Sequence, residues 1–196
     1  MGYPSIWSGN EAPGTPCIIG CGVYAIIFGK SSGALGIGPA PPMDRRTTNA
    51  ETGETVDNQD ILDEIIYNFK ANVFMKTFEL KGPADRVTLY VTLYLLQCLK
   101  RLQGVKKENA KATLLALAVE KFSGPGEAGF PFTALYPSGF TPAELQLWKD
   151  YMKQLRLEVS ARLPMYVYAH PTTEGLGNVH WMVFSKYTFL EAALEK

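Results

Sequence analysis

Residues 60–103 read DILDEIIYNFKANVFMKTFELKGPADRVTLYVTLYLLQCLKRLQ, and this stretch decides the fold. Gly82-Pro83 divides it into two expected helices, because proline lacks an N–H and is accommodated best in the first turn of a helix. The second helix, from Pro83 to about Leu102, is apolar on almost every side. Such a helix must be buried all round in a globular protein. We therefore expect a mainly α-helical fold, with a central apolar helix enclosed by other helices.

The first of these helices has a clear start signal. Asp60 can act as its N-cap, and the acidic Asp63 and Glu64 suit the positive end of the helix dipole. Its apolar residues recur mostly four positions apart, which predicts one buried face. This face consists of Ile61, Ile65, Phe69 and Val73, widened by Ile66 and Phe74. Gly82-Pro83 is expected to end the segment.

A third helix is expected from Lys107 to Phe122. Its period predicts that one set of apolar side chains points inward: Ala112, Leu115, Ala118, Val119 and Phe122. The segment 124–131 follows as a connector rich in glycine and proline, which interrupts helical structure.

A fourth helix begins at Thr141-Pro142-Ala143-Glu144, where Thr, Pro and Glu occupy the positions of a capping box. Its expected buried stripe is Leu145, Trp148, Met152, Leu155 and Val159. Its expected basic outer side is Lys149, Lys153, Arg156 and Arg162. We expect Pro164 to end this helix.

The remaining segments predict little regular structure. Runs rich in β-forming residues predict a few short strands, one from the N-terminal arm at 23–28 and two near the C-terminus at 165–168 and 180–187. The final residues, 189–196, are expected to turn helical. Residues 1–56 form a Gly/Pro-rich arm, expected to be partly extended and part of the same domain as the helical region 57–196.

Composition narrows the function. The 196-residue chain has no formal net charge, which disfavours nucleic acid or an anionic membrane as its main partner. No apolar run approaches the roughly 20 residues of a membrane span, and the first residues lack the basic region of a secretory signal. Its three cysteines are an odd number without a disulfide spacing, which is typical of reduced thiols in a cytosolic protein.

Gly29-Lys30-Ser31 superficially resembles a phosphate-binding loop. That motif needs a glycine five residues before the second glycine, and Tyr24 stands at this position. The sequence therefore does not favour nucleotide binding.

Metal binding and thiol catalysis also lack a supporting pattern. A structural zinc site needs four ligands, whereas Cys17 and Cys21 are far in sequence from the two histidines, His170 and His180. No local signature marks a Cys/His nucleophile pair. We expect no catalytic residues, no cofactor and no metal site, so the protein is not expected to be an enzyme.

Two groups of residues are candidates for binding a partner protein. Lys70, Asn72 and Lys76 surround Phe74, and an aromatic anchor ringed by polar groups is typical of binding hot spots. Packing of Phe74 in the core is an equally good interpretation. A second group is Lys149, Lys153 and Arg156 on the fourth helix, which could meet an acidic partner or could simply be solvated.

Several ordered blocks resemble a known family. Asp63-Glu64, residues 67–74 and Ala84-Asp85-Arg86 closely resemble subunit 3, the 21 kDa-class subunit, of the actin-related protein 2/3 complex. Further blocks fit this family in order: 38–41, 125–131 with 134–136, 151–163 and 181–190. The arm, residues 107–122 and Ala128 depart from the family pattern, which indicates a divergent member.

This resemblance implies a helical fold with one enclosed helix and no enzymatic activity. It implies a structural subunit of a seven-subunit cytoplasmic assembly, packed on the larger actin-related protein, that supports nucleation of branched actin filaments. Contact with the existing actin filament is also implied. The alternative hypotheses are a helical adaptor that binds amphipathic peptides in a groove and a small cysteine-dependent enzyme.

Overall fold

The computed structural model describes residues 16–22, 60–192 and 194, and within these residues the protein is mainly helical, as predicted. A short antiparallel hairpin of β1 (Cys17–Ile18) and β2 (Cys21–Gly22) precedes the helices. The α-helices are α1 (Ile61–Asn72), α2 (Pro83–Arg101), α3 (Lys107–Val119), α4 (Pro142–Val167) and α5 (Val179–Met182). Two 3₁₀ helices, η1 (Thr133–Leu135) and η2 (Val183–Lys186), complete the described elements.

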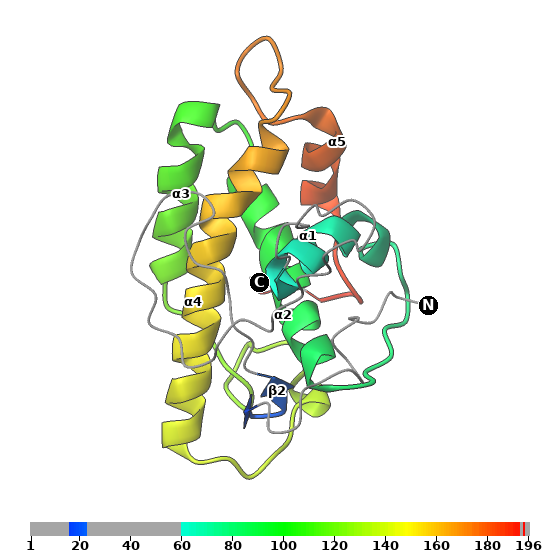
Figure 1. Ribbon diagram of the computed structural model, residues 1–196, viewed down its shortest axis with the longest axis vertical. Helices are drawn as coiled ribbons and strands as arrows, with labels where there is room; N and C mark the ends of the chain where they lie inside the picture. Colours follow the sequence, from blue (N-terminus) through cyan, green and yellow to red (C-terminus); the bar gives the residue numbers. More distant parts are fainter. Residues whose placement is uncertain (1–15, 23–59, 193, 195–196) are drawn as a thin grey trace, which may run out of the picture.

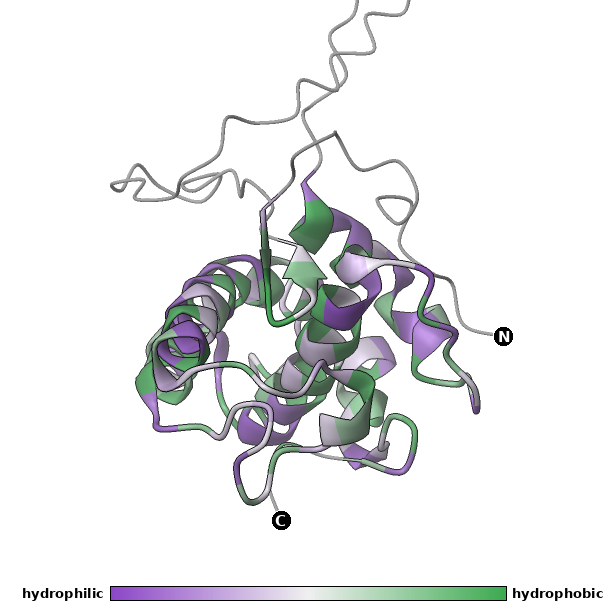
Figure 2. Ribbon diagram, turned by 90° about the horizontal axis from the view of Figure 1, so that it is seen from below, coloured by the Kyte–Doolittle hydropathy of each residue, from purple (hydrophilic) through white to green (hydrophobic). Residues whose placement is uncertain are grey.

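Helix α2 is the centre of the fold. Every residue from Val87 to Leu99 is buried. Helices α1, α3, α4 and α5, the 3₁₀ helix η2 and strand β2 all contact it. The long α4 and the neighbouring α3 cover one side of α2, while α1 and α5 lie on its other side (Figure 1). In the view from below, α2 lies among the other helices (Figure 2). The prediction of an enclosed central helix is therefore confirmed.

The start of α1 has the predicted cap. The backbone N–H groups of Leu62 and Asp63 donate to Asp60 Oδ1 at 3.0 and 3.1 Å, and the side chain of Asp63 accepts from the N–H of Asp60 at 3.2 Å. The end was placed too late, because α1 stops at Asn72 and the chain runs irregularly to Gly82. Apolar residues recur beyond Val73, at Phe74 and Phe78, so the spacing alone does not mark the end of this helix.

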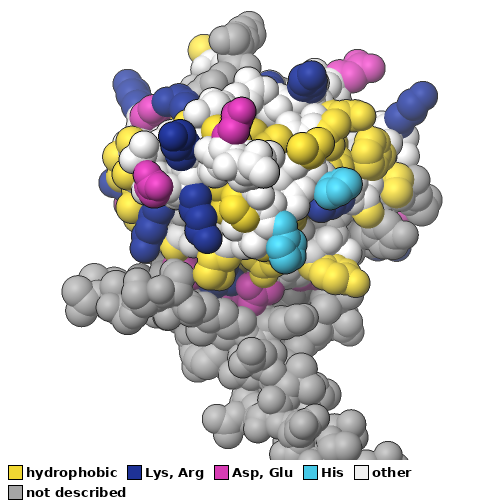
Figure 3. Space-filling view, turned by 90° about the horizontal axis from the view of Figure 1, so that it is seen from above, with side chains coloured by type: hydrophobic (Ala, Val, Ile, Leu, Met, Phe, Trp, Pro, Cys, Tyr) yellow, Lys and Arg dark blue, Asp and Glu magenta, His cyan; other side chains and the backbone are white. Residues whose placement is uncertain are grey.

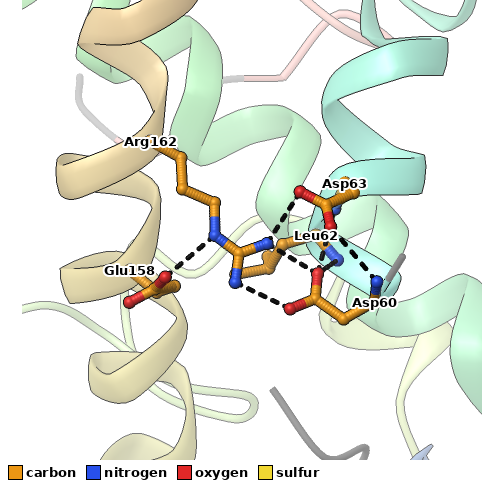
Figure 4. Close-up of polar contacts among 5 residues, drawn as sticks. All are labelled: Asp60, Leu62, Asp63, Glu158 and Arg162. Atoms are coloured by element: carbon orange, nitrogen blue, oxygen red, sulfur yellow. Dashed lines mark hydrogen bonds and ion pairs between the residues drawn. The ribbon is translucent and has the colours of Figure 1, made fainter. Parts of the chain in front are cut away.

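Arg162 joins α4 to the start of α1 (Figure 4). Its Nη1 and Nη2 atoms donate to the two oxygens of Asp60 at 2.7 Å each, and Nη1 also reaches Asp63 Oδ1 at 2.9 Å. Its Nε atom donates to Glu158 Oε1 at 2.9 Å. The prediction that Arg162 lies on an exposed basic side is wrong: its side chain is 1% exposed. Burial of a guanidinium is tolerated because these carboxylates surround it.

Helix α4 begins as predicted but does not end at Pro164. At its start the N–H of Glu144 donates to Thr141 Oγ1 at 3.2 Å, and Glu144 Oε2 accepts from the N–H of Thr141 at 2.6 Å. At the other end the helix passes through Pro164 to Val167, and the N–H of Tyr168 closes the last turn on the carbonyl of Pro164 at 2.9 Å. Proline removes one helical hydrogen bond there, which a helix of 26 residues packed along its length tolerates.

Helix α3 buries a different face from the predicted one. Ala118 is buried as expected, but Leu115 and Val119 are 37% and 57% exposed, and Ala112 is also exposed. The buried residues are Ala110, Leu114, Leu117 and Ala118, and Phe122 beyond the helix is partly buried. Apolar residues occupy several sides of this short helix, so its period does not select one face. Contact with α4 selects it.

The hairpin is tied to the body by Arg86. Ile19 and Gly20 both have positive φ, 49° and 69°, as a two-residue hairpin turn of type I′ requires. Arg86 donates from Nη1 to the Gly20 carbonyl at 3.1 Å and from Nε to the Leu135 carbonyl at 2.7 Å. The arm therefore does supply two short strands. The predicted strand at 23–28 lies outside the described residues. The predicted boundary at 56/57 and the block 38–41 lie outside them too.

Both predicted C-terminal strands are wrong. Residues 165–167 belong to α4, and residues 179–186 form α5 and η2. Short apolar runs do not distinguish a strand from a buried helical turn, and packing against α2 decides here. The expected helix at 189–196 is also absent from the described part of this segment, where Phe189 and Ala192 instead form an isolated antiparallel bridge.

Candidate protein-binding surface

Phe74 follows the end of α1 and belongs to an aromatic cluster that reaches the surface. Its ring lies 5.5 Å from that of Phe184 and 5.4 Å from that of Tyr187, measured between centroids. Phe184 is buried, whereas Phe74 and Tyr187 are 59% and 37% exposed. An exposed aromatic side chain supported by a buried one can be inserted into a partner at little cost in side-chain entropy.

Lys70 extends this cluster along α1. Its Nζ lies 4.4 Å from the ring centroid of Trp181 in α5, a cation–π distance. Trp181 in turn stacks on the buried Phe69, with centroids 5.8 Å apart and planes 8° apart. We call the exposed Phe74 and Tyr187, together with Lys70 and the buried rings of Trp181, Phe69 and Phe184 that support them, the aromatic surface.

The structure brings together only part of the first predicted group, which consists of Lys70, Asn72, Phe74 and Lys76. Lys70 and Phe74 join the aromatic surface, and Lys76 is exposed nearby in sequence. Asn72 is 1% exposed, so its side chain does not belong to the exposed part of the surface. The idea that Phe74 widens the buried stripe of α1 is wrong, because the helix has ended before it.

The sequence did not reveal the C-terminal half of this surface. Trp181 and Tyr187 lie more than 100 positions after Lys70, in a segment expected to form a strand. The available signal was the concentration of aromatic residues in 181–189. Tyr166, which is 40% exposed, extends the same cluster, since its ring lies 6.1 Å from that of Trp181. Only the packing of α5 and η2 against α2 brings these rings beside α1.

The second predicted group does not form one basic surface. Lys149 Nζ lies 2.7 Å from Glu127, and this contact lowers the pKa of the Glu127 carboxyl below its usual value. Lys153 is exposed. Arg156 is 1% exposed and inside the protein, where its guanidinium lies 4.5 and 4.3 Å from the ring centroids of Tyr94 and Phe122. Because α4 packs on α1, α2 and α3, it buries a wider arc than the predicted stripe.

A hollow of about 440 Å³ lies beside α5, at the end of the molecule opposite the hairpin. Leu102, Leu176 and Val179 are among its lining residues, and Val179 and Val183 are 67% and 44% exposed. Figure 3 shows hydrophobic side chains at this end beside the two histidines. This is the second place where apolar side chains gather at the surface.

Two of the three thiols are buried. Burial raises the pKa of both Cys21 and Cys98 to about 12, so neither forms a thiolate near neutral pH. Cys21 Sγ accepts a hydrogen bond from Trp148 Nε1 at 3.4 Å, and Cys17 is exposed. The described residues contain no group of three His, Cys, Asp or Glu side chains that could hold a metal ion.

The part of the chain that the structure describes has no helix long and apolar enough to cross a membrane. Fold and surface together define a small, mainly helical protein with an enclosed core and exposed aromatic anchors. This combination is typical of a protein that binds other proteins.

Comparison with known proteins identifies the family. Residues 27–194 match the family model P21-Arc, described as "ARP2/3 complex ARPC3 (21 kDa) subunit". The chain belongs to this family, which confirms the resemblance that the ordered blocks predicted.

Curated relatives agree with this assignment. The chain is 40% identical to "Actin-related protein 2/3 complex subunit 3" of Schizosaccharomyces pombe, over 80% of this chain and 83% of the relative. It is 37% identical to the protein of the same name from Dictyostelium discoideum, over 84% and 95%. The Arabidopsis thaliana protein of this name is 36% identical, over 80% and 83%.

Proposed function

We propose that this protein is a non-catalytic structural subunit of the actin-related protein 2/3 complex and supports nucleation of branched actin filaments. The observation that carries the proposal is the family match over residues 27–194. Its partners are the actin-related proteins and the other subunits, together with the actin filament, and it acts in the cytoplasm at the actin cytoskeleton. The raised pKa values of the buried thiols agree with a role without catalysis.

The mechanism is differential binding. A subunit promotes nucleation only if it binds the active arrangement of its partners more tightly than the inactive one. The rigid enclosed core suits this role, because a close-packed interior holds its surface side chains in fixed positions. The aromatic surface is our candidate for one of these contacts, since Phe74 is exposed yet held by Phe184 and Tyr187.

Affinity purification of the tagged full-length chain from its own cells tests the assembly. We expect actin-related proteins and the other subunits to co-purify in stoichiometric amounts. Recovery of the chain alone, or only with unrelated proteins, would refute the proposal. It would leave the helical adaptor as the remaining hypothesis, with the hollow beside α5 as its candidate groove.

Two substitutions test the aromatic surface. Phe74→Ala is expected to weaken assembly by about 2 kcal/mol of binding free energy, roughly thirtyfold, as for a hot-spot aromatic. Lys70→Glu should also weaken it, because it replaces the cation over Trp181 by an anion. Pull-down of partner subunits by the purified variants measures both effects.

Matched controls separate assembly from folding. Val119→Ala removes an apolar side chain of nearly equal exposure, and Lys111→Glu reverses an exposed charge on α3. Circular dichroism must show that all four variants keep their helical content. If Phe74→Ala and Lys70→Glu recover as much partner as the controls and the Cys→Ser variants, the aromatic surface is not an assembly contact.

A further inference from the structure

The outer face of α1 carries a large aromatic side chain that the core does not use. Tyr67 is 87% exposed, more than any other large hydrophobic side chain in the part of the chain that the structure describes. It lies two residues from both Ile65 and Phe69, which are buried, and therefore on the opposite side of the helix. A single exposed ring needs no explanation, but Tyr67 has neighbours on the same face.

These neighbours have the spacing of a helix–helix contact. Lys70, Ala71 and Phe74 follow Tyr67 by three, four and seven residues, so the four side chains surround one spot on the helix surface. The helix has ended before Phe74, but Val73 keeps right-handed helical dihedrals, φ −59° and ψ −30°, so the Cα of Phe74 still lies at helical spacing. Four residues at this spacing form the hole that accepts a side chain, or knob, from a facing helix. We call them the α1 hole.

The α1 hole has a small floor between two large walls. Ala71 is partly exposed between Tyr67 and Phe74, which the helical rise places about 10 Å apart along the axis. Phe74 is fixed by its aromatic neighbours, and Lys70 is held to one side by Trp181, 4.4 Å from its Nζ. Because these side chains are already in place, little side-chain entropy is lost when the hole is filled.

We propose that a helix of another subunit packs across the outer face of α1 and inserts one apolar side chain into the α1 hole. The inference rests on the proposed function, because it takes the occupant from the complex to which the family belongs. The occupant is apolar because the methyl group of Ala71 and two rings surround it. The face is continuous with the aromatic surface through Lys70 and Phe74, so the same partner covers both.

Filling the hole is the sharpest test. Ala71→Leu keeps a good helix former, and it should weaken binding to the complex assembled without this subunit about tenfold, because the new side chain occupies the place of the knob. Ala112→Leu, the same change at an exposed position of α3, is the matched control and should bind like the unchanged chain. Fluorescence anisotropy of the labelled chain measures both affinities. Equal affinities of the two variants would overturn the proposal.

Removing a wall gives a second test that does not depend on folding. Tyr67→Ala should weaken binding about tenfold and leave the unfolding midpoint unchanged, because this side chain is exposed. Tyr67→Phe keeps the ring and should bind within about threefold of the unchanged chain. Leu147→Ala, at an exposed position of α4, is the matched control. Equal binding by Tyr67→Ala and Leu147→Ala would exclude Tyr67 from the interface.

A double variant tests whether one knob touches both walls. Tyr67→Ala combined with Phe74→Ala should weaken binding by less than the product of the two single effects, because both rings hold the same side chain. A full product would mean two separate contacts and would overturn the shared hole.

Cross-linking identifies the occupant. p-Benzoylphenylalanine replaces Tyr67 in the assembled complex and is activated by light, and mass spectrometry identifies the linked peptides. We expect links to one segment of another subunit. Links to the first 59 residues of this chain, links to a second copy, or no links at all would overturn the assignment. Co-purification of the intact complex would still support the proposed function in each of these cases, so the two proposals can fail separately.

Discussion

At the scale of single residues, the buried Arg162 has the largest expected effect on stability. Arg162→Met removes the cation from between Asp60 and Glu158, whose side chains are 3% and 8% exposed. Breaking a buried ion pair on one side is expected to lower the free energy of unfolding by about 3–5 kcal/mol, because it leaves buried carboxylates uncompensated. Urea denaturation followed by circular dichroism measures the loss.

Arg101 provides the matched control, because it also pairs with a carboxylate through two nitrogens. Its pair with Glu120 is exposed, at 39% and 45%. Arg101→Met is expected to cost less than about 1 kcal/mol, since solvent screens an exposed pair. Similar losses for the two variants would show that burial is not what makes Arg162 important.

The three cysteines are expected to react very differently. Cys17 is exposed, whereas Cys21 and Cys98 are buried and have pKa values raised to about 12. At pH 8 the native protein should therefore add one iodoacetamide group, because the thiolate is the reactive form. Intact-mass spectrometry counts the adducts, and the protein in urea, where all three should react, is the control. A second native adduct formed as fast as the first would contradict this assignment.

At the scale of elements, helix starts were predictable because their signals are local. The caps at Asp60 and Thr141 involve partners only two or three residues away. The buried faces of the helices were harder to predict than their starts. Leu115 and Val119 were expected inside and are exposed, because α3 offers apolar side chains in several directions and α4 covers only one of them.

The cap of α4 can be tested separately. Thr141→Ala removes the acceptor for the Glu144 N–H and is expected to cost about 1 kcal/mol of unfolding free energy, whereas Thr141→Ser keeps the acceptor and should cost only a few tenths. Contacts with Thr141 also lower the pKa of Glu144. That contribution is present above the usual pKa of glutamate and lost as pH falls through the lowered value, but its largest part comes from the Thr141 N–H, which both variants keep. Only the hydrogen bond from Thr141 Oγ1 to Glu144 is both lost in Thr141→Ala and dependent on the Glu144 charge, so the difference between the two variants should narrow in acid without vanishing. Urea denaturation across this pH range checks the expectation.

At the scale of the whole molecule, stability should depend on the central helix. Leu95 is completely buried in α2, and Leu95→Ala is expected to cost about 2–5 kcal/mol through lost burial and the cavity left behind. Leu147→Ala is the matched control, because Leu147 lies on α4 and is 55% exposed. It is expected to lower the free energy of unfolding by less than about 0.5 kcal/mol. Thermal unfolding followed by calorimetry compares them. Equal unfolding midpoint temperatures for Leu95→Ala and Leu147→Ala would contradict the enclosed position of α2.

The aromatic surface shows where prediction from the sequence stops. Phe74 and Lys70 were identified as candidates from their neighbours in the sequence, and the structure places them against Tyr187 and Trp181, respectively. Whether they bind a partner stays a prediction. Arg156 was expected on the surface because charged side chains are usually exposed. The residues around it in the sequence do not predict that its guanidinium contacts the rings of Tyr94 and Phe122.

The sequence by itself determined the helical class, the enclosed α2, the caps and the family, because these depend on period, nearest neighbours and ordered motifs along the chain. The tertiary structure alone decided which face of α3 is buried, where α1 ends, and that Arg156 and Arg162 lie inside. It also decided that α1 and α5 share one surface. These features depend on contacts between residues far apart in the chain, such as Asp60 with Arg162, and a local pattern carries no information about such a pair.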